Sequence, residues 1–135
     1  MKKILRVVLP ALLLLGAAAL PACKTHRPGV KSAFGSQFAV VDAGVEPATA
    51  AAVAVLEEMG LEEVRATSTE VDGEVTAFKE DRTRVEVYVA TEAEGRSEIS
   101  VMVGAMGDAA TGTGIIARIR EKLGSGAAPA GTVGP

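Results

Sequence analysis

The sequence predicts a two-layer α+β sandwich, in which two helices cover one face of a mainly antiparallel sheet of about five strands. Segments that alternate Val, Ile or Ala with polar residues recur between 61 and 103, as expected of strands with one buried face. Two segments, 48–59 and 109–123, instead carry apolar residues every three or four positions and predict helices. The predicted order is β-α-β-β-β-β-α, within one folded domain at 37–123.

The first strand and the first helix are predicted between 38 and 60. Residues 38–41 form a short apolar run, and 42–44 interrupt it. Pro47 suits the first turn of a helix, because its missing N–H has no helical partner there. Gly60 is a typical C-terminal stop. The apolar stripe of this helix comprises Thr49, Ala52, Val53, Leu56 and Met59.

Four more strands follow, and their alternation predicts their register. A three-residue hairpin loop at 80–82 places the valines of the two flanking strands on one face, whereas a two-residue loop at 81–82 would mix the faces. The first loop requires Arg82 at a position that favours Gly. The predicted pairs are Ala77 with Val85, Val75 with Val87, and Val89 with Ile99.

Asp108 is predicted to be the N-cap of the last helix, because its carboxylate can accept hydrogen bonds from the first free N–H groups. The helical stripe that follows comprises Ile115, Ile116, Ile119 and Leu123. Residues 124–135 are rich in Gly, Ala and Pro, so we predict a disordered tail there.

Residues 1–22 are predicted to be a signal peptide. Lys2, Lys3 and Arg6 precede an uncharged apolar stretch, 7–20, that is shorter than the roughly 20 residues of a bilayer-spanning helix. Three outcomes compete at its end. An ordinary signal peptidase could release a soluble protein, the segment could remain as an uncleaved anchor, or the site could be lipidated.

Leu20, Pro21, Ala22 and Cys23 resemble the bacterial lipobox, with Pro21 as a departure from its usual small or β-branched residue. We favour lipidation because Cys23 is the only cysteine, and an unpaired thiol in an exported protein requires an explanation. The resemblance implies a diacylglyceryl thioether on Cys23 and an acylated amino terminus, and two such chains anchor a protein stably. Residues 23–36 would then be a lipid-anchored tether.

The resemblance also implies a location in the bacterial cell envelope. Lys24 follows the cysteine where many inner-membrane lipoproteins carry aspartate, so we expect the outer membrane, facing the periplasm. Basic residues of the tether could lie on anionic headgroups, or the tether could be a solvated spacer.

The composition argues against several classes of function. Asp and Glu outnumber Lys and Arg by 17 to 14, and clustered positive charge, which non-specific nucleic-acid binding needs, is missing. The only histidine, His26, lies in the predicted tether, so no Ser/His/Asp set or metal site is expected. The glycines at 104–107 resemble a phosphate-binding loop in spacing, but Asp108 would repel a phosphate. We therefore expect no cofactor and no enzyme activity.

Phe78, Tyr88 and Met102 form the candidate partner surface. In the predicted register they point away from the Val, Ala and Ile face. If both helices cover that apolar face, these three side chains form an exposed, partly apolar patch, which often marks a binding surface. Alternatively, they are single apolar residues that a surface strand tolerates, or a helix covers them.

Three segments, LEEMGL at 56–61, GEV at 73–75 and ISVMVGAMGD at 99–108, resemble a family of small bacterial lipoproteins of unknown function. This chain has Met102 where that family suggests arginine, and Arg82 where its hairpin usually has glycine. The resemblance implies the fold and the anchor but no activity. We therefore expect a non-enzymatic interaction or structural module with an envelope protein as partner. The alternative is a small-molecule or lipid-binding carrier.

Overall fold

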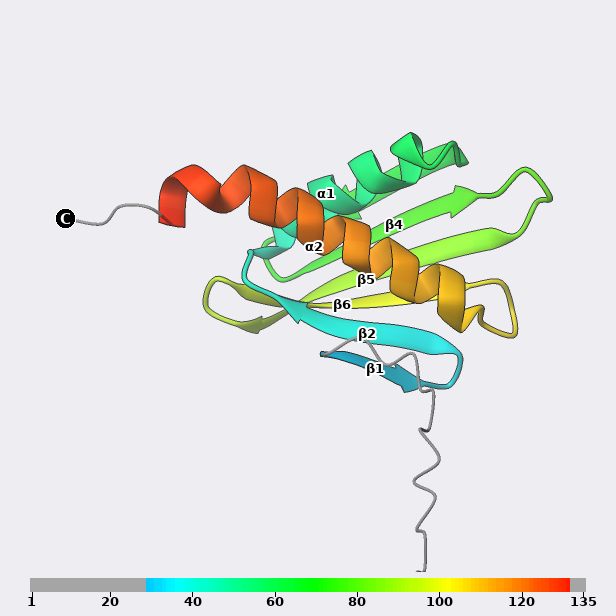
Figure 1. The fold of residues 1–135 in the computed structure, drawn as a ribbon, viewed down its shortest axis with the longest axis horizontal. Coiled ribbons are helices and arrows are strands. Elements are labelled where there is room, and N and C mark those ends of the chain that lie inside the picture. Colours follow the sequence, from blue (N-terminus) through cyan, green and yellow to red (C-terminus); the bar gives the residue numbers. More distant parts are fainter. Residues whose placement is uncertain (1–28, 132–135) are drawn as a thin grey trace, which may run out of the picture.

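The computed structural model describes residues 29–131, so the predicted signal peptide, the lipobox and Cys23 lie outside the described residues. One antiparallel sheet has the strand order β1-β2-β6-β5-β4-β3, and two helices lie across one of its faces (Figure 1). This confirms the predicted two-layer α+β sandwich, with six strands instead of about five. The elements are β1 (Val30–Ala33), β2 (Ser36–Val41), α1 (Val45–Glu58), β3 (Glu62–Ser68), β4 (Asp72–Phe78), β5 (Arg84–Ala93), β6 (Arg96–Val103) and α2 (Ala109–Gly131).

Strand β1 lies inside the segment that the sequence predicted to be a tether, 23–36. It pairs with β2 through a two-residue turn at Phe34 and Gly35, whose φ values are +49° and +84°. Only Val30 of its four residues is buried, opposite Ala39. The strand was missed because a four-residue edge strand with a single buried side chain has no alternation to detect.

The predicted register of the central strands is confirmed. Val75 pairs with Val87, and Val89 pairs with Ile99. The hairpin between β4 and β5 closes by a hydrogen bond from the N–H of Lys79 to the carbonyl of Thr83, at 2.9 Å. Arg82 adopts a φ of +67°, the left-handed conformation that a three-residue loop requires.

Helix α1 begins three residues earlier than the sequence predicted, because Val45 is itself buried. Its end is as predicted: Gly60 has a φ of +78°, and the N–H of Leu61 donates to the carbonyl of Leu56 at 3.0 Å. This pattern is a Schellman motif, which satisfies carbonyls at the helix end. Thr49, Ala52 and Leu56 of the predicted stripe are buried, whereas Val53 and Met59 are only half-buried.

Helix α2 is capped as predicted and is longer than predicted. Ile115, Ile116 and Ile119 are fully buried against the sheet, and the helix continues to Gly131 beyond the edge of the sheet (Figure 1). The predicted disordered tail at 124–135 therefore begins with helix. The alanines at 127, 128 and 130 favour this continuation, since Ala is the strongest helix former.

Two glycines allow the helices to lie close to the sheet. A Cβ on Gly73 of β4 would overlap Oγ1 of Thr49 on α1. A Cβ on Gly112 of α2 would lie 2.9 Å from Cγ of Gln37 on β2. The core is accordingly built from small and β-branched side chains of both layers.

Candidate functional site

The sheet has one face covered by helices and one face that no described element covers. Val85, Val87 and Val89 of β5 point to the helices and are buried. Their neighbours Arg84, Glu86 and Tyr88 therefore point to the opposite face, since side chains alternate along a strand. We call this second surface the open face.

The predicted partner residues lie on the open face, but they are not all neighbours. Tyr88 is 45% exposed and pairs with Ser100, while Met102 is half-buried and pairs with Glu86. Tyr88 and Met102 are therefore diagonal neighbours, within reach of long side chains. Phe78 pairs with Arg84, one cross-strand row beyond Glu86, and so lies apart from Tyr88.

Phe78 instead belongs to the β4–β5 hairpin. The guanidinium carbon of Arg82 lies 4.8 Å from the centre of the Phe78 ring, a cation–π geometry. Nη1 of Arg82 also donates to Oε1 of Glu63 at 3.1 Å. The ring is thus covered in part by its own chain, which makes it less accessible to a partner than Tyr88.

Phe38 is a member of this surface that the sequence interpretation missed. It pairs with Ser100 on the open face and is half-buried, as is Val40 on the same strand. We call Phe38, Tyr88, Ser100 and Met102 the sheet patch. Ala39 and Val41 are the buried residues of this strand, so Phe38 and Val40 face the other way. All four residues are apolar, so the sequence has no alternation that would distinguish the two faces.

Charged groups border the sheet patch. Arg84 and Glu86 form an ion pair at 2.9 Å, and Glu74 lies opposite Tyr88. Burial raises the pKa of the Tyr88 hydroxyl, and the negative charges of Glu86 and Glu74 raise that pKa further. A side-chain hydrogen bond with Glu74 adds to the same shift, so the hydroxyl already has an acceptor on the neighbouring strand.

The family described as "Protein of unknown function (DUF3568)" matches residues 5–122, which include the lipobox-like residues and nearly all of the sandwich. The chain belongs to the DUF3568 family. This confirms the expected membership of a family of unknown function, while the lipidation of Cys23 stays a prediction. No curated protein matches the chain.

The glycine-rich loop of this DUF3568 chain leads into an ordinary helix cap. Oδ1 of Asp108 accepts a hydrogen bond from the N–H of Thr111 at 3.0 Å, and Oδ2 accepts one from its hydroxyl at 2.6 Å. These bonds hold the pKa of Asp108 below its usual value. The first turn of α2 is thus occupied by the protein's own carboxylate, where a phosphate would have to bind.

Four glutamates at 57–58 and 62–63 are exposed, and two of them form ion pairs within the fold. Glu58 pairs with Lys122, which links α1 to α2, and Glu63 pairs with Arg82. Within residues 29–131 there is no cluster of three or more His, Cys, Asp or Glu side chains that could hold a metal. Across the same range, no helix has the length and apolar character needed to cross a bilayer.

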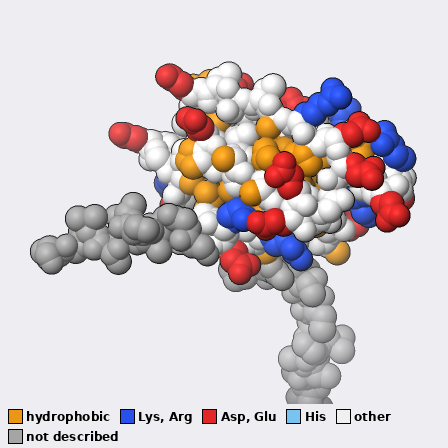
Figure 2. Space-filling model, turned by 90° about the horizontal axis from the view of Figure 1, so that it is seen from above, with side chains coloured by type: hydrophobic (Ala, Val, Ile, Leu, Met, Phe, Trp, Pro, Cys, Tyr) orange, Lys and Arg blue, Asp and Glu red, His pale blue; other side chains and the backbone are white. Residues whose placement is uncertain are grey.

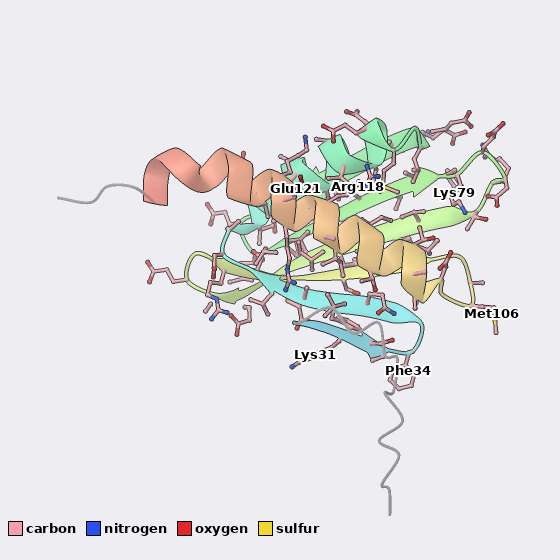
Figure 3. The ribbon with its side chains drawn as sticks, in the orientation of Figure 1. Lys31, Phe34, Lys79, Met106, Arg118 and Glu121 are labelled. Atoms are coloured by element: carbon pink, nitrogen blue, oxygen red, sulfur yellow. The ribbon has the colours of Figure 1, made fainter. Side chains whose placement is uncertain are left out.

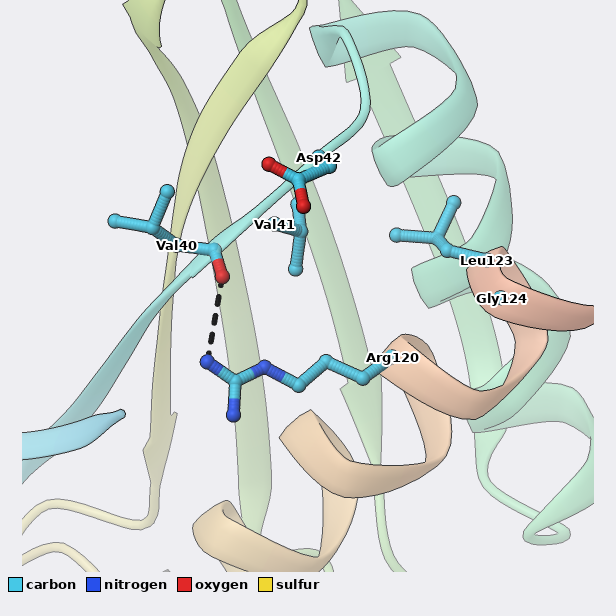
Figure 4. Close-up of a pocket in the computed structure, with 6 residues that line it drawn as sticks. All are labelled: Val40, Val41, Asp42, Arg120, Leu123 and Gly124. Carbon is cyan, nitrogen blue, oxygen red and sulfur yellow. Dashed lines mark hydrogen bonds between the residues drawn. The ribbon is translucent and has the colours of Figure 1, made fainter. Parts of the chain in front are cut away.

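A hollow of about 380 Å³ lies between the end of β2 and α2 (Figure 4). Its lining includes Val40, Asp42, Arg120 and Leu123. Nη2 of Arg120 donates to the carbonyls of Val40 and Gly29, each at 3.3 Å. The guanidinium therefore fastens α2 to the first two strands.

Proposed function

We propose that this DUF3568 protein is a lipid-anchored protein of the bacterial envelope that binds a protein partner through the open face of its sheet. In this proposal it has no catalytic activity and needs no cofactor. The observation that carries the proposal is the sheet patch, a partly exposed and mainly apolar group on the face of the sheet opposite the helices.

The composition of the open face supports a protein partner. Tyr and Met are enriched at the centres of protein interfaces, and charged residues usually form the rim. Here Tyr88 and Met102 lie at the centre, and the Arg84–Glu86 ion pair lies beside them.

The anchor is the second part of the proposal. Cys23 would carry the fatty chains, with Leu20, Pro21 and Ala22 as the recognition residues. The family match, which begins at residue 5, covers all four. We place the protein on the outer membrane, facing the periplasm, where the anchor would hold the sandwich close to envelope proteins.

Labelling of growing cells with palmitate tests the anchor. The wild-type chain should carry label and sediment with membranes, and the Cys23→Ser variant should lose both properties, because a hydroxyl cannot form the thioether. An unlabelled wild-type chain in the soluble fraction would refute the anchor.

Photo-crosslinking in intact cells tests the partner surface. A photoreactive amino acid at Tyr88 should give a discrete crosslinked product, and the same probe at Val71 should not. Val71 is a matched control because it is apolar and 63% exposed but lies in the β3–β4 turn. Alanine at Phe38 and Met102 should reduce the Tyr88 product. Equal crosslinking at both sites would reject this surface.

The alternative function, a small-molecule or lipid carrier, rests on a second hollow. Figure 2 shows apolar side chains exposed on the upper surface of the molecule. A space of about 540 Å³ beside α1 and α2 is lined mainly by apolar residues. They are Ala43, Pro47, Ala50, Ala51 and Leu123, with Asp42 and Lys122. Native mass spectrometry of protein extracted from its own membrane should then detect a retained ligand. A spectrum of unliganded protein alone would exclude the carrier function.

A further inference from the structure

Two apolar side chains project into solvent from neighbouring turns at one end of the sheet (Figure 3). Phe34, in the β1–β2 turn, is 101% exposed, and Met106, in the β6–α2 loop, is 91% exposed. The backbones of the two turns lie against each other. If Gly35 carried a Cβ, that atom would lie 3.1 Å from the carbonyl oxygen of Met106. A Cβ on Gly107 would lie 2.6 Å from Cα of Gly35. We call this pair the Phe34–Met106 tip.

The conformation of Phe34 is unfavourable for the isolated domain. Its φ of +49° is in the left-handed region, which bulky residues rarely adopt. Two-residue hairpin turns of this kind favour Asn or Gly at this position. The domain therefore carries a strained aromatic residue that contacts nothing within the fold, which indicates a contact outside it.

The residues next to Phe34 and Met106 in the chain have uncharged side chains. Residues 33–36 and 103–107 contain no charged side chain. Asp108 follows the second segment, and its carboxylate interacts favourably with the nearby ammonium group of Lys79. The β4–β5 hairpin at the same end of the sheet is charged, and its Lys79 and Asp81 pair with each other at 4.0 Å. The aromatic and thioether side chains can enter the boundary between lipid headgroups and acyl chains while these paired charges stay among the headgroups.

We propose that the Phe34–Met106 tip inserts into the surface of the lipid bilayer to which the chain is anchored. This inference rests on the proposed anchor at Cys23. Six residue steps join Cys23 to Gly29, and at about 3.5 Å per residue they span at most ~21 Å. The five steps from Gly29 to Phe34, mostly along β1, cover about 16 Å. The anchor can therefore reach the same plane as the tip.

Insertion of the tip would set the orientation of the whole sandwich. The end of the sheet that carries the tip would face the lipid, and the β3–β4 turn with Val71 would point away from it. The open face would then stand roughly upright from the membrane and remain accessible to a partner.

Single-tryptophan fluorescence tests this orientation, because the chain contains no tryptophan of its own. The lipidated Phe34→Trp and Met106→Trp proteins would be reconstituted into phosphatidylethanolamine/phosphatidylglycerol vesicles that contain brominated phosphatidylcholine. Val71→Trp is the matched control at the opposite end of the sheet. We expect blue-shifted emission at positions 34 and 106 and quenching by the brominated chains several-fold stronger than at position 71.

Two outcomes would overturn the inference and leave the anchor intact. In the first, palmitate-labelled protein floats with the vesicles but is quenched equally at positions 34 and 71. In the second, the emission at position 34 shifts to the blue with rising protein density and without bromine quenching, which means that a second copy covers the tip. A wild-type chain that carries no palmitate would instead refute the anchor, and the tip proposal with it.

Discussion

The close approach of α1 to β4 makes Gly73→Ala the most informative single substitution in the core. The new Cβ would overlap Oγ1 of Thr49 and would lie 3.3 Å and 3.4 Å from Cβ and Cγ2 of the same residue. The three nearest atoms thus belong to one side chain. Among the described residues, the Thr49 hydroxyl is also the only buried side-chain polar atom without a hydrogen-bond partner.

Two opposing effects determine the size of the change. Overpacking of a core costs about 1–3 kcal/mol. Replacing Gly by Ala at a compatible backbone position stabilises by about 0.4–1 kcal/mol, because the unfolded chain loses freedom. Gly73 has no positive φ, so its backbone is compatible with Ala. We therefore expect Gly73→Ala to lower the free energy of unfolding by about 1–2 kcal/mol.

The Thr49→Ala background reverses this expectation. It removes Oγ1 and Cγ2, two of the three atoms nearest to the added methyl group, including the one that this group would overlap. Gly73→Ala should then be neutral or stabilising by up to ~1 kcal/mol, which gives a coupling energy of about 1–3 kcal/mol between the two sites. Urea unfolding of a non-lipidated chain that begins at residue 24 measures all four variants. If Gly73→Ala has the same effect in both backgrounds, the helix does not approach the sheet as described.

Three further substitutions test other parts of the fold. Gly114→Ala should raise the free energy of unfolding by about 0.5–1 kcal/mol, because a Cβ there meets nothing within 4 Å. Gly112→Ala should raise the free energy of unfolding by less, or should lower it, because its Cβ would meet Gln37. Equal increases at the two positions would contradict the tight packing of α2 against the sheet. Asp108→Ala should lower the melting temperature at pH 7. The hydrogen bonds from Thr111 lower the pKa of Asp108 in the folded state below 3.8. The stabilisation by Asp108 should therefore be lost as the pH falls below 3.8 and through the folded-state pKa. A difference in melting temperature between wild type and Asp108→Ala that does not change with pH would exclude an ionised N-cap. Phe34→Asn should stabilise the non-lipidated chain by about 1 kcal/mol, since Asn tolerates the left-handed conformation. In the lipidated Met106→Trp protein, the same substitution should weaken quenching by the brominated lipid. A lower free energy of unfolding for Phe34→Asn would mean that Phe34 is not strained.

Much of the sandwich could be predicted from local pattern. The alternating valines of β5 specify the buried face, and a slip by one residue would expose all of them. The same alternation gave the correct pairing of Val75 with Val87 and assigned Tyr88 to the opposite face. The N-cap at Asp108 and the stop at Gly60 were also predicted correctly, because both depend on residues close in sequence.

The candidate site was only partly predictable. The sequence identified Tyr88 and Met102 but grouped them with Phe78, which the hairpin holds apart beneath Arg82. Phe38 was assigned to a strand but not to a face, because β2 pairs with β6, which is distant in sequence. No local pattern encodes the partner of an individual strand.

Local periodicity therefore settled the faces, caps and hairpin of this protein, since each depends on residues within a few positions of one another. Long-range packing decided the order of the strands and the meeting of Phe34 with Met106. These features bring together segments separated by some 70 residues, which only the collapse of the whole chain can do.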